Sequence, residues 1–154
     1  VNRLVYECYP EDFFATLFYA EYEPATRVLK YVNAGHNAPM VVRPRNDSCE
    51  MYHLNSGGQP VGISPDSELA TTIFQFEIGD VLVAYTDGIT EVENPRSDQW
   101  GEQRLEKLLR SRSQESPERI IDGILDEVSA FADGQPQRDD ATLVVMSVQE
   151  GCEV

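Results

Sequence analysis

The sequence is poor in positive charge. Its 154 residues include 27 acidic side chains and only 12 lysines and arginines, which gives a formal net charge of -15. The longest basic stretch is residues 43–45, where two arginines flank a proline. Nucleic acid or an anionic lipid surface would be repelled by such a chain, because the electrostatic part of the binding energy has the wrong sign. We therefore expect no nucleic-acid partner.

Long hydrophobic runs are absent as well. The longest ones, at residues 81–85 and 143–146, are far shorter than the roughly 20 apolar residues of a membrane-spanning helix. No membrane helix is therefore expected. The chain opens at Val1 without a methionine, and its first residues show neither a signal peptide nor a lipid anchor. This opening suggests a part of a longer or processed protein, whose targeting information would lie upstream.

Cysteine and histidine are scarce. The three cysteines, Cys8, Cys49 and Cys152, are widely spaced and form no CxxC pair, so a disulfide framework or a zinc site is not expected. Reduced thiols fit a cytoplasmic protein. The sequence has only two histidines and no GxSxG segment, which leaves little support for a serine nucleophile. A P-loop, a Rossmann glycine pattern and an EF-hand loop are also missing, which argues against nucleotide binding and calcium switching.

The apolar pattern that is present predicts a single α+β domain. Hydrophobic residues make up 41% of the chain, which is enough for one sizeable core, and a second independent domain is not expected. The loop around Gly57 and Gly58 is expected to have positive φ. The sheet is expected to be mainly antiparallel and meandering. Strands are predicted at residues 13–22, which we expect to be covered on both faces, and at 28–34, 39–43, 50–54, 70–76, 81–85 and 141–148.

Two helices are predicted in the second half of the chain. Ser116 followed by Pro117 is typical of a helix start, and apolar residues then recur on one face of a helix over residues 117–132. A shorter helix is predicted over residues 101–110, with Trp100 packed at its start. Both apolar stripes are interpreted as ordinary core packing. Antiparallel strands with helices in separate segments are typical of an α+β layered architecture.

Two acidic segments stand at the ends of predicted strands. Asp87 follows the strand at residues 81–85, and Gly88 after it allows close approach of the backbone to a ligand. Asp139 and Asp140 precede the last strand, and two adjacent carboxylates repel each other unless solvent or a cation relieves them. Each pattern alone is also common in ordinary turns. Together they favour a hard divalent ion such as Mg²⁺ or Mn²⁺, which prefers carboxylate oxygens.

A third polar segment, residues 33–37, lies between two apolar strands. His36 in this segment can act as a hydrogen-bond donor beside a site or as a proton carrier. Asn33 and Asn37 are expected to satisfy backbone groups of the turn. A purely structural hairpin role for the whole segment is the alternative, and His53 is expected to be an ordinary strand residue.

Five separated segments carry a family resemblance. They are, in chain order, FATLFYAEYEPATRVLKYVNAGHNAPMVV, GGQPVGI, GDVLVAYTDGITE, WGEQRL and QRDDATLVV. Taken together, they resemble the SpoIIE/RsbU branch of the PPM superfamily, the protein phosphatase 2C-like enzymes. The resemblance runs from about Leu4 to Val148. It implies a partial phosphatase domain at residues 1–148, a tail at 149–154, and a layered α/β/β/α sandwich of two antiparallel sheets.

The resemblance also implies a site and a reaction. Asp87 and Asp139 match metal-binding and catalytic carboxylates of the family, and Asp140 occupies the adjacent position as a weaker match. Gly88, His36 and Asn37 are implied as neighbours of that site. The family uses two Mn²⁺ or Mg²⁺ ions about 4 Å apart, which hold a water for in-line attack on phosphorus. Its substrates are phosphoserine or phosphothreonine on a regulatory protein such as an anti-sigma-factor antagonist.

One family motif is missing from the sequence. No DxSGKG-like segment, which bridges both ions in the family, occurs here, and the chain is expected to begin in the helix that follows it. We therefore expect the N-terminal part of the domain to be missing and this chain alone to have little or no activity. Exposed strand edges would favour a homodimer or strand exchange. Two alternatives remain open: a non-catalytic, phosphatase-like protein-binding module, and a plain acidic domain whose two aspartates are turn residues.

Overall fold

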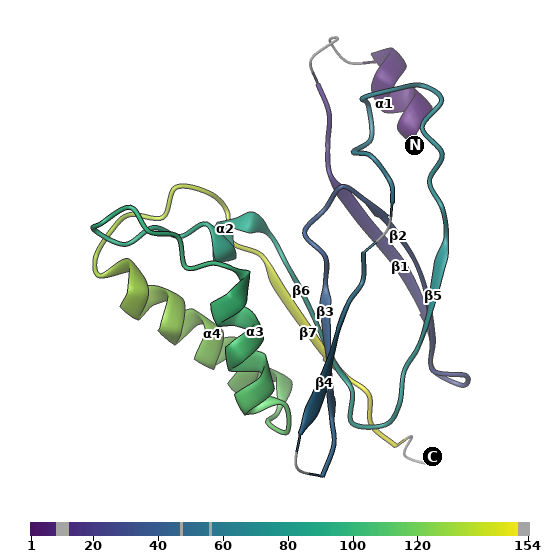
Figure 1. The fold of residues 1–154 in the computed structure, drawn as a ribbon. Coiled ribbons are helices and arrows are strands. Elements are labelled where there is room, and N and C mark those ends of the chain that lie inside the picture. Colours follow the sequence, from purple (N-terminus) through teal and green to yellow (C-terminus); the bar gives the residue numbers. More distant parts are fainter. Residues whose placement is uncertain (9–12, 47, 56, 151–154) are drawn as a thin grey trace. The chain divides into compact units, whose positions relative to one another are not determined.

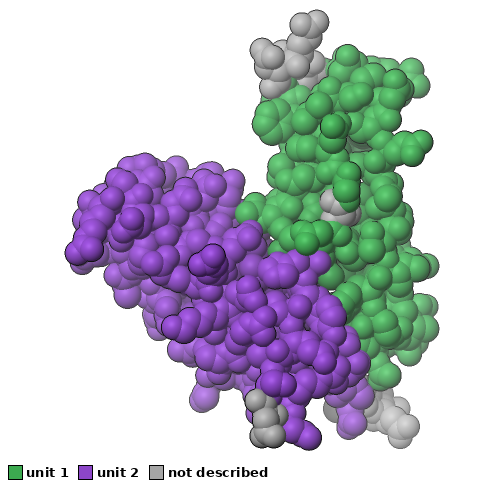
Figure 2. Space-filling model, viewed as in Figure 1, with its two compact units in different colours: residues 1–38, 54–76 green, residues 39–53, 77–154 purple. Residues whose placement is uncertain are grey.

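The fold was obtained as a computed structural model, which describes residues 1–8, 13–46, 48–55 and 57–150. The chain divides into two compact units, shown in different colours in Figure 2. Unit 1 comprises Val1–Ala38 and Leu54–Phe76, and unit 2 comprises Pro39–His53 and Glu77–Val154. Each unit contains one antiparallel sheet (Figure 1). Two antiparallel sheets with accompanying helices confirm the predicted α+β class.

Unit 1 is a three-stranded sheet in the order β1-β2-β5, accompanied by helix α1. Its elements are α1 (Asn2–Cys8), β1 (Leu17–Glu23), β2 (Val28–Ala34) and β5 (Thr72–Gln75). The predicted hairpin is confirmed, with the ends of β1 and β2 paired in antiparallel register. The prediction that the first strand is covered on both faces is wrong. Half-buried and exposed residues alternate along most of β1, and Tyr19 is 54% exposed, so one face of this strand is open to solvent.

The loop after β4 was predicted to have positive φ around Gly57 and Gly58; Gly58 does not have it, and in this loop it occurs at Gly62 instead. Among the described glycines of unit 1, positive φ occurs at Gly35 and Gly62, with values of 72° and 95°. Residue 58 needs to be a glycine for a steric reason rather than for its φ angle. A Cβ atom at Gly58 would lie 2.8 Å from the carbonyl oxygen of Asn33, so the loop packs directly on the backbone of β2.

Unit 2 contains a four-stranded sheet in the order β4-β3-β6-β7. Its strands are β3 (Met40–Pro44), β4 (Cys49–His53), β6 (Val81–Tyr85) and β7 (Leu143–Ser147). The sheet is not the simple meander that was predicted, since β3 pairs with β6 across a long stretch of sequence and places Met40 opposite Val83. These two central strands are buried along nearly their whole length. Strands in the middle of the sheet therefore have continuous apolar sequences rather than alternating apolar and polar residues.

The described residues of unit 2 also form three helices, namely α2 (Asp87–Thr90), α3 (Glu102–Arg112) and α4 (Pro117–Ala132). Helices α3 and α4 contact each other and the sheet, α3 through β3 and β4 and α4 through β7 (Figure 1). The Ser116 hydroxyl caps α4, and Asp133 ends it in the left-handed conformation with φ of 46°. Trp100 is buried at the start of α3, as predicted. The buried core consists of Met40, Val42, Val81, Val83, Tyr85, Ile89, Trp100, Leu105, Leu108, Leu109, Ile120 and Ile124.

A buried ion pair fixes the end of the sheet at which β6 begins. Arg43 Nε and Nη2 donate to the two carboxylate oxygens of Asp80 at 2.8 and 2.7 Å. Asp80 is fully buried, and its carbonyl accepts a hydrogen bond from Val148 N at 2.9 Å. This pair therefore joins β3, the start of β6 and the end of β7. Asp80 precedes β6 and Asp87 follows it, so the two acids mark opposite ends of one strand.

In the part of the chain that the structure describes, every helix is too short or too polar to cross a bilayer. Cys152 and most of the predicted tail, residues 151–154, lie outside the described residues.

Candidate functional site

The first acidic segment, which carries Asp87, directly follows the firmly packed strand β6. Tyr85, the last residue of β6, is buried and donates its hydroxyl to Glu102 Oε1 of α3 at 2.9 Å. Burial, and then this hydrogen bond, raise the pKa of the Tyr85 phenol. The residues after α2 are also held, since Gly101 N donates to Thr90 O at 2.8 Å. The turn that carries Asp87 is therefore anchored on both sides.

Thr86 connects the two acidic segments. Its hydroxyl donates to the carbonyl oxygen of Asp140 at 3.0 Å and accepts from Thr142 N at 2.9 Å. Its backbone N–H donates to Thr142 O at 3.1 Å. The three bonds extend the β6–β7 pairing beyond the last sheet pair, Tyr85 with Leu143. We call these three hydrogen bonds of Thr86 to Asp140 and Thr142 the Thr86 clamp. Asp87 and Asp139 are sequence neighbours of Thr86 and Asp140, so the clamp brings their segments together.

Gly88 allows the same two segments to touch. A Cβ atom at this position would lie 2.4 Å from the Asp140 carbonyl oxygen and 2.8 Å from the carbonyl carbon. No side chain fits such a gap without movement of the backbone. The small residue after Asp87 is therefore explained by close approach to the second acidic segment of the chain itself.

The carboxylates of the two segments are partly free. One oxygen of Asp87 accepts from Gly88 N at 2.9 Å, and one oxygen of Asp139 accepts from Asp140 N at 2.8 Å. The remaining carboxylate oxygens of both residues accept no hydrogen bond from any described residue. Both side chains belong to exposed residues. These hard, accessible oxygens fit a divalent ion such as Mg²⁺ or Mn²⁺, which needs only one or two protein carboxylates together with water and phosphate.

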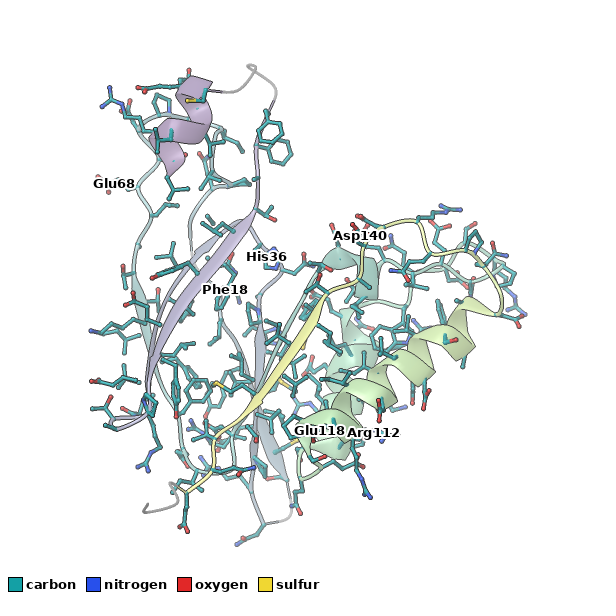
Figure 3. The ribbon with its side chains drawn as sticks, turned by 180° about the vertical axis from the view of Figure 1, so that it is seen from behind. Phe18, His36, Glu68, Arg112, Glu118 and Asp140 are labelled. Atoms are coloured by element: carbon teal, nitrogen blue, oxygen red, sulfur yellow. The ribbon has the colours of Figure 1, made fainter. Side chains whose placement is uncertain are left out.

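Two carboxylates are nevertheless a small ligand set. Within residues 1–8, 13–46, 48–55 and 57–150, no group of three or more His, Cys, Asp or Glu side chains is arranged to hold a metal ion. Asp140 contributes its backbone carbonyl to the Thr86 clamp, and Figure 3 shows it beside α2, just before the start of β7. The donor type fits the ion, whereas the number of protein donors is at the lower end of what such an ion uses.

A cavity of about 170 Å³ lies next to these segments in unit 2. Two of its lining residues form an ion pair, from Arg138 Nη1 to Glu93 Oε2 at 3.0 Å. Gln137 helps to shape the same segment, because its side-chain amide donates to Asp139 O at 2.7 Å. The cavity is lined by Gly88, Glu91, Val92, Glu93, Gln99, Gln135, Pro136, Gln137, Arg138 and Asp139.

The predicted His36 turn belongs to unit 1 and is built around Asn33. The buried Asn33 side chain accepts from His36 N at 2.8 Å and donates to His36 O at 3.0 Å, which confirms its turn-stabilising role. The His36 ring, labelled in Figure 3, is in hydrogen-bond contact with the Thr16 hydroxyl through Nδ1 at 3.2 Å. Asn37 makes no side-chain hydrogen bond with the described residues, so the expectation for it is not met.

Sequence reasoning missed three residues of unit 2, namely Thr86, Thr142 and the Glu93 partner of Arg138. A threonine directly before an aspartate at a strand end was a usable signal, because hydroxyls in such places often bond nearby backbone. The ion pair had no such signal, since its two residues are far apart in the sequence.

Comparison with known proteins agrees with this fold. Residues 1–149 match the family model described as Stage II sporulation protein E (SpoIIE). The chain is 32% identical to Protein IcfG of Synechocystis sp. over 133 residues, which are 86% of this chain and 20% of that protein. It is 29% identical to phosphoserine phosphatase RsbU of Bacillus subtilis over 148 residues, 95% of this chain and 42% of RsbU. The chain thus spans less than half of the length of these relatives.

A solved structure shows the same fold. The phosphatase domain of the cell fate determinant SpoIIE from Bacillus subtilis, presoaked with Mn, superimposes with a TM-score of 0.68 at 17% identity. The match covers 97% of this chain and 64% of that one. The two antiparallel sheets with their helices therefore match the protein phosphatase 2C fold.

Proposed function

The chain belongs to the SpoIIE family of protein phosphatase 2C-like (PPM) domains, and from this premise we propose a function for its two acidic segments. Asp87 and Asp139 hold Mn²⁺ or Mg²⁺ in a phosphatase that removes phosphate from serine or threonine of a regulatory protein. Asp140 lies beside them as a weaker ligand candidate. The observation that carries this proposal is the Thr86 clamp, which brings the two segments together at one end of the sheet.

In this proposal the metal ion and the protein residues have separate roles in the reaction. A bound divalent ion supplies Lewis-acid stabilisation of the phosphoryl oxygens and activates a water. The chain's own residues orient the ligands: Thr86 holds the backbone of Asp140, and Gly88 lets that backbone approach α2. Such positioning matters because a displacement of about 1 Å can slow a reaction by roughly a hundredfold.

The substrate is proposed from the relatives. RsbU is named a phosphoserine phosphatase, and this chain is 29% identical to it. A phosphorylated regulatory protein, such as an anti-sigma-factor antagonist in the cytoplasm, is the corresponding substrate here. Residues 1–148 form the phosphatase portion and 149–154 a tail in this proposal, and a homodimer is compatible with it.

The 154-residue chain alone is expected to turn over phosphopeptide slowly or not at all. Among the described residues no group of three or more His, Cys, Asp or Glu side chains is arranged to hold a metal ion, and fewer ligands in place mean weaker metal binding and a poorly held water. Rapid Mn²⁺-dependent hydrolysis of a serine phosphopeptide by this chain would contradict that expectation.

The metal assignment is tested by a manganese titration that follows the signal of free Mn²⁺ by electron paramagnetic resonance. Asp87→Asn and Asp139→Asn should each weaken binding by about tenfold or more, since each removes a charged ligand. Asp122→Asn is the matched control, because Asp122 is exposed on α4 and forms no ion pair with a described residue. Unchanged affinity in both site variants would overturn the assignment and favour the plain acidic domain whose two aspartates are turn residues.

A further inference from the structure

The cavity beside Asp139 has an unusual charge arrangement. Among the described residues that line it, Glu91, Glu93 and Asp139 are acidic, and Arg138 is the one basic side chain. Arg138 is 72% exposed at its side chain and reaches Glu93 Oε2 at 3.0 Å, whereas the Glu93 side chain is only 25% exposed. The guanidinium therefore lies at the cavity while most of it still faces solvent.

A phosphorylated substrate meets an electrostatic problem here. A phosphate monoester carries a charge of about -1.5 to -2 at neutral pH, and the chain has a net charge of -15. Three carboxylates line the cavity that such a group would enter. A protein cation at this point would offset part of that repulsion.

We propose that Arg138 binds the phosphoryl group of the substrate, and that Glu93 holds Arg138 beside the cavity until phosphate replaces it. The inference rests on the proposed function, because it assigns a substrate-binding residue to the same site. A guanidinium matches phosphate with two parallel hydrogen bonds, and the phosphate dianion is a stronger partner than one carboxylate. An exposed ion pair is weak, so the exchange of partners is easy.

The size of the cavity agrees with this role. Its volume of about 170 Å³ is smaller than the roughly 300–1,000 Å³ of pockets that enclose drug-sized ligands. A phosphorylated side chain presented by another protein needs only a small, accessible recess. The side-chain amides of Gln99 and Gln137 at the same cavity are further polar groups for such a ligand.

A purely structural role for the ion pair predicts a different pattern of mutant effects. If the pair only ties residue 93 to residue 138, then Glu93→Gln and Arg138→Ala should both weaken phosphate binding. If Arg138 binds phosphate, Glu93→Gln removes its competitor and should strengthen phosphate binding. The two variants should then have opposite effects.

The test is an NMR titration of the 154-residue chain with a phosphoserine peptide, in buffer with EDTA so that no metal contributes. We expect Arg138→Ala to weaken binding by about tenfold or more, as the loss of a charge-assisted bond implies. Arg138→Lys should restore part of the affinity, and Glu93→Gln should raise it above that of the wild type. Arg96→Ala is the matched control, because Arg96 is exposed, forms no ion pair with a described residue and does not line the cavity.

Several results would overturn the inference. These are no detectable binding by the wild type, equal losses in Arg138→Ala and Arg96→Ala, binding of the unphosphorylated peptide as tight as that of the phosphopeptide, or weaker binding by Glu93→Gln. The manganese titration reports separately on the proposed function. If Asp87→Asn and Asp139→Asn lose Mn²⁺ while Arg138→Ala keeps full phosphopeptide affinity, the metal assignment stands and this inference fails.

Discussion

Thr86 and Asp140 are joined by a hydrogen bond of 3.0 Å from the Thr86 hydroxyl to the Asp140 carbonyl oxygen, although they are 54 residues apart in the sequence. The same hydroxyl accepts from Thr142 N at 2.9 Å. One side chain thus holds the backbone of the second acidic segment against the residue that precedes the first. The positions of the segments that carry Asp87 and Asp139 depend on this contact.

Removal of the Thr86 hydroxyl should loosen the second acidic segment. Thr86→Val keeps the side-chain shape but leaves Asp140 O and Thr142 N without this partner. We expect the free energy of unfolding to fall by about 0.5–1.5 kcal/mol, because water replaces the bonds only in part. Urea denaturation measures this loss. Thr86→Ser retains the hydroxyl and is the control, so equal losses in both variants would show that the two hydrogen bonds do not matter.

A side chain at residue 88 should disturb the site more strongly. In Gly88→Ala the new methyl group would meet the Asp140 carbonyl, 2.4 Å from an ideal Cβ position. Relief requires a shift of α2 or of the second acidic segment, and we expect a destabilisation of about 1–3 kcal/mol in thermal or urea unfolding. Gly57→Ala is the matched control, because nothing lies within 4 Å of its Cβ position. Equal stability of the two alanine variants would contradict the close approach.

The buried ion pair at the other end of β6 should contribute to stability rather than to the site. Asp80→Asn keeps the volume but leaves the guanidinium of Arg43, a residue only 8% exposed, without its bidentate partner. The free energy of unfolding should fall by about 1–3 kcal/mol, since a buried charge loses its bidentate partner and keeps the half-exposed Glu77 carboxylate, 2.7 Å from Arg43 Nη1, as its remaining ion-pair partner. Asp122→Asn should leave urea denaturation unchanged. A loss in Asp80→Asn no larger than in this control would contradict the prediction.

Stability should depend on pH through Glu50. The Arg45 guanidinium, and then the Tyr52 hydroxyl, bond the Glu50 carboxylate and lower its pKa to about 2 from the usual 4.5. Because the folded-state pKa lies below the unfolded one, the stabilisation is present above pH 4.5 and is lost as pH falls toward 2. We expect Glu50→Gln to flatten the pH dependence of unfolding in this window. The difference should shrink at high salt, since Glu50 and Arg45 are both exposed. If the wild type and Glu50→Gln unfolded with the same pH dependence, the lowered pKa of Glu50 would not be its cause.

The local pattern of the sequence determined where most elements lie. The strands at residues 28–34 and 81–85 and the helix at 117–132 have the predicted bounds, because an apolar run or period is bounded there by a turn, a glycine or a capping serine. Less sharply bounded strands shifted by one or more residues, and β1 begins at Leu17 rather than at residue 13. The short helix α2 was not predicted, since four residues carry no periodicity.

The sequence by itself also placed Asp87, Gly88, Asp139 and Asp140 at strand ends, because strand boundaries are local features. Only the tertiary structure decided that β3 pairs with β6, that Thr86 bonds Asp140, and that Arg138 pairs with Glu93. Periodicity tells which face of an element is buried, but it does not name the partner on the other side. That choice depends on the packing of segments distant in sequence, and it is this packing that brings the two acidic segments together.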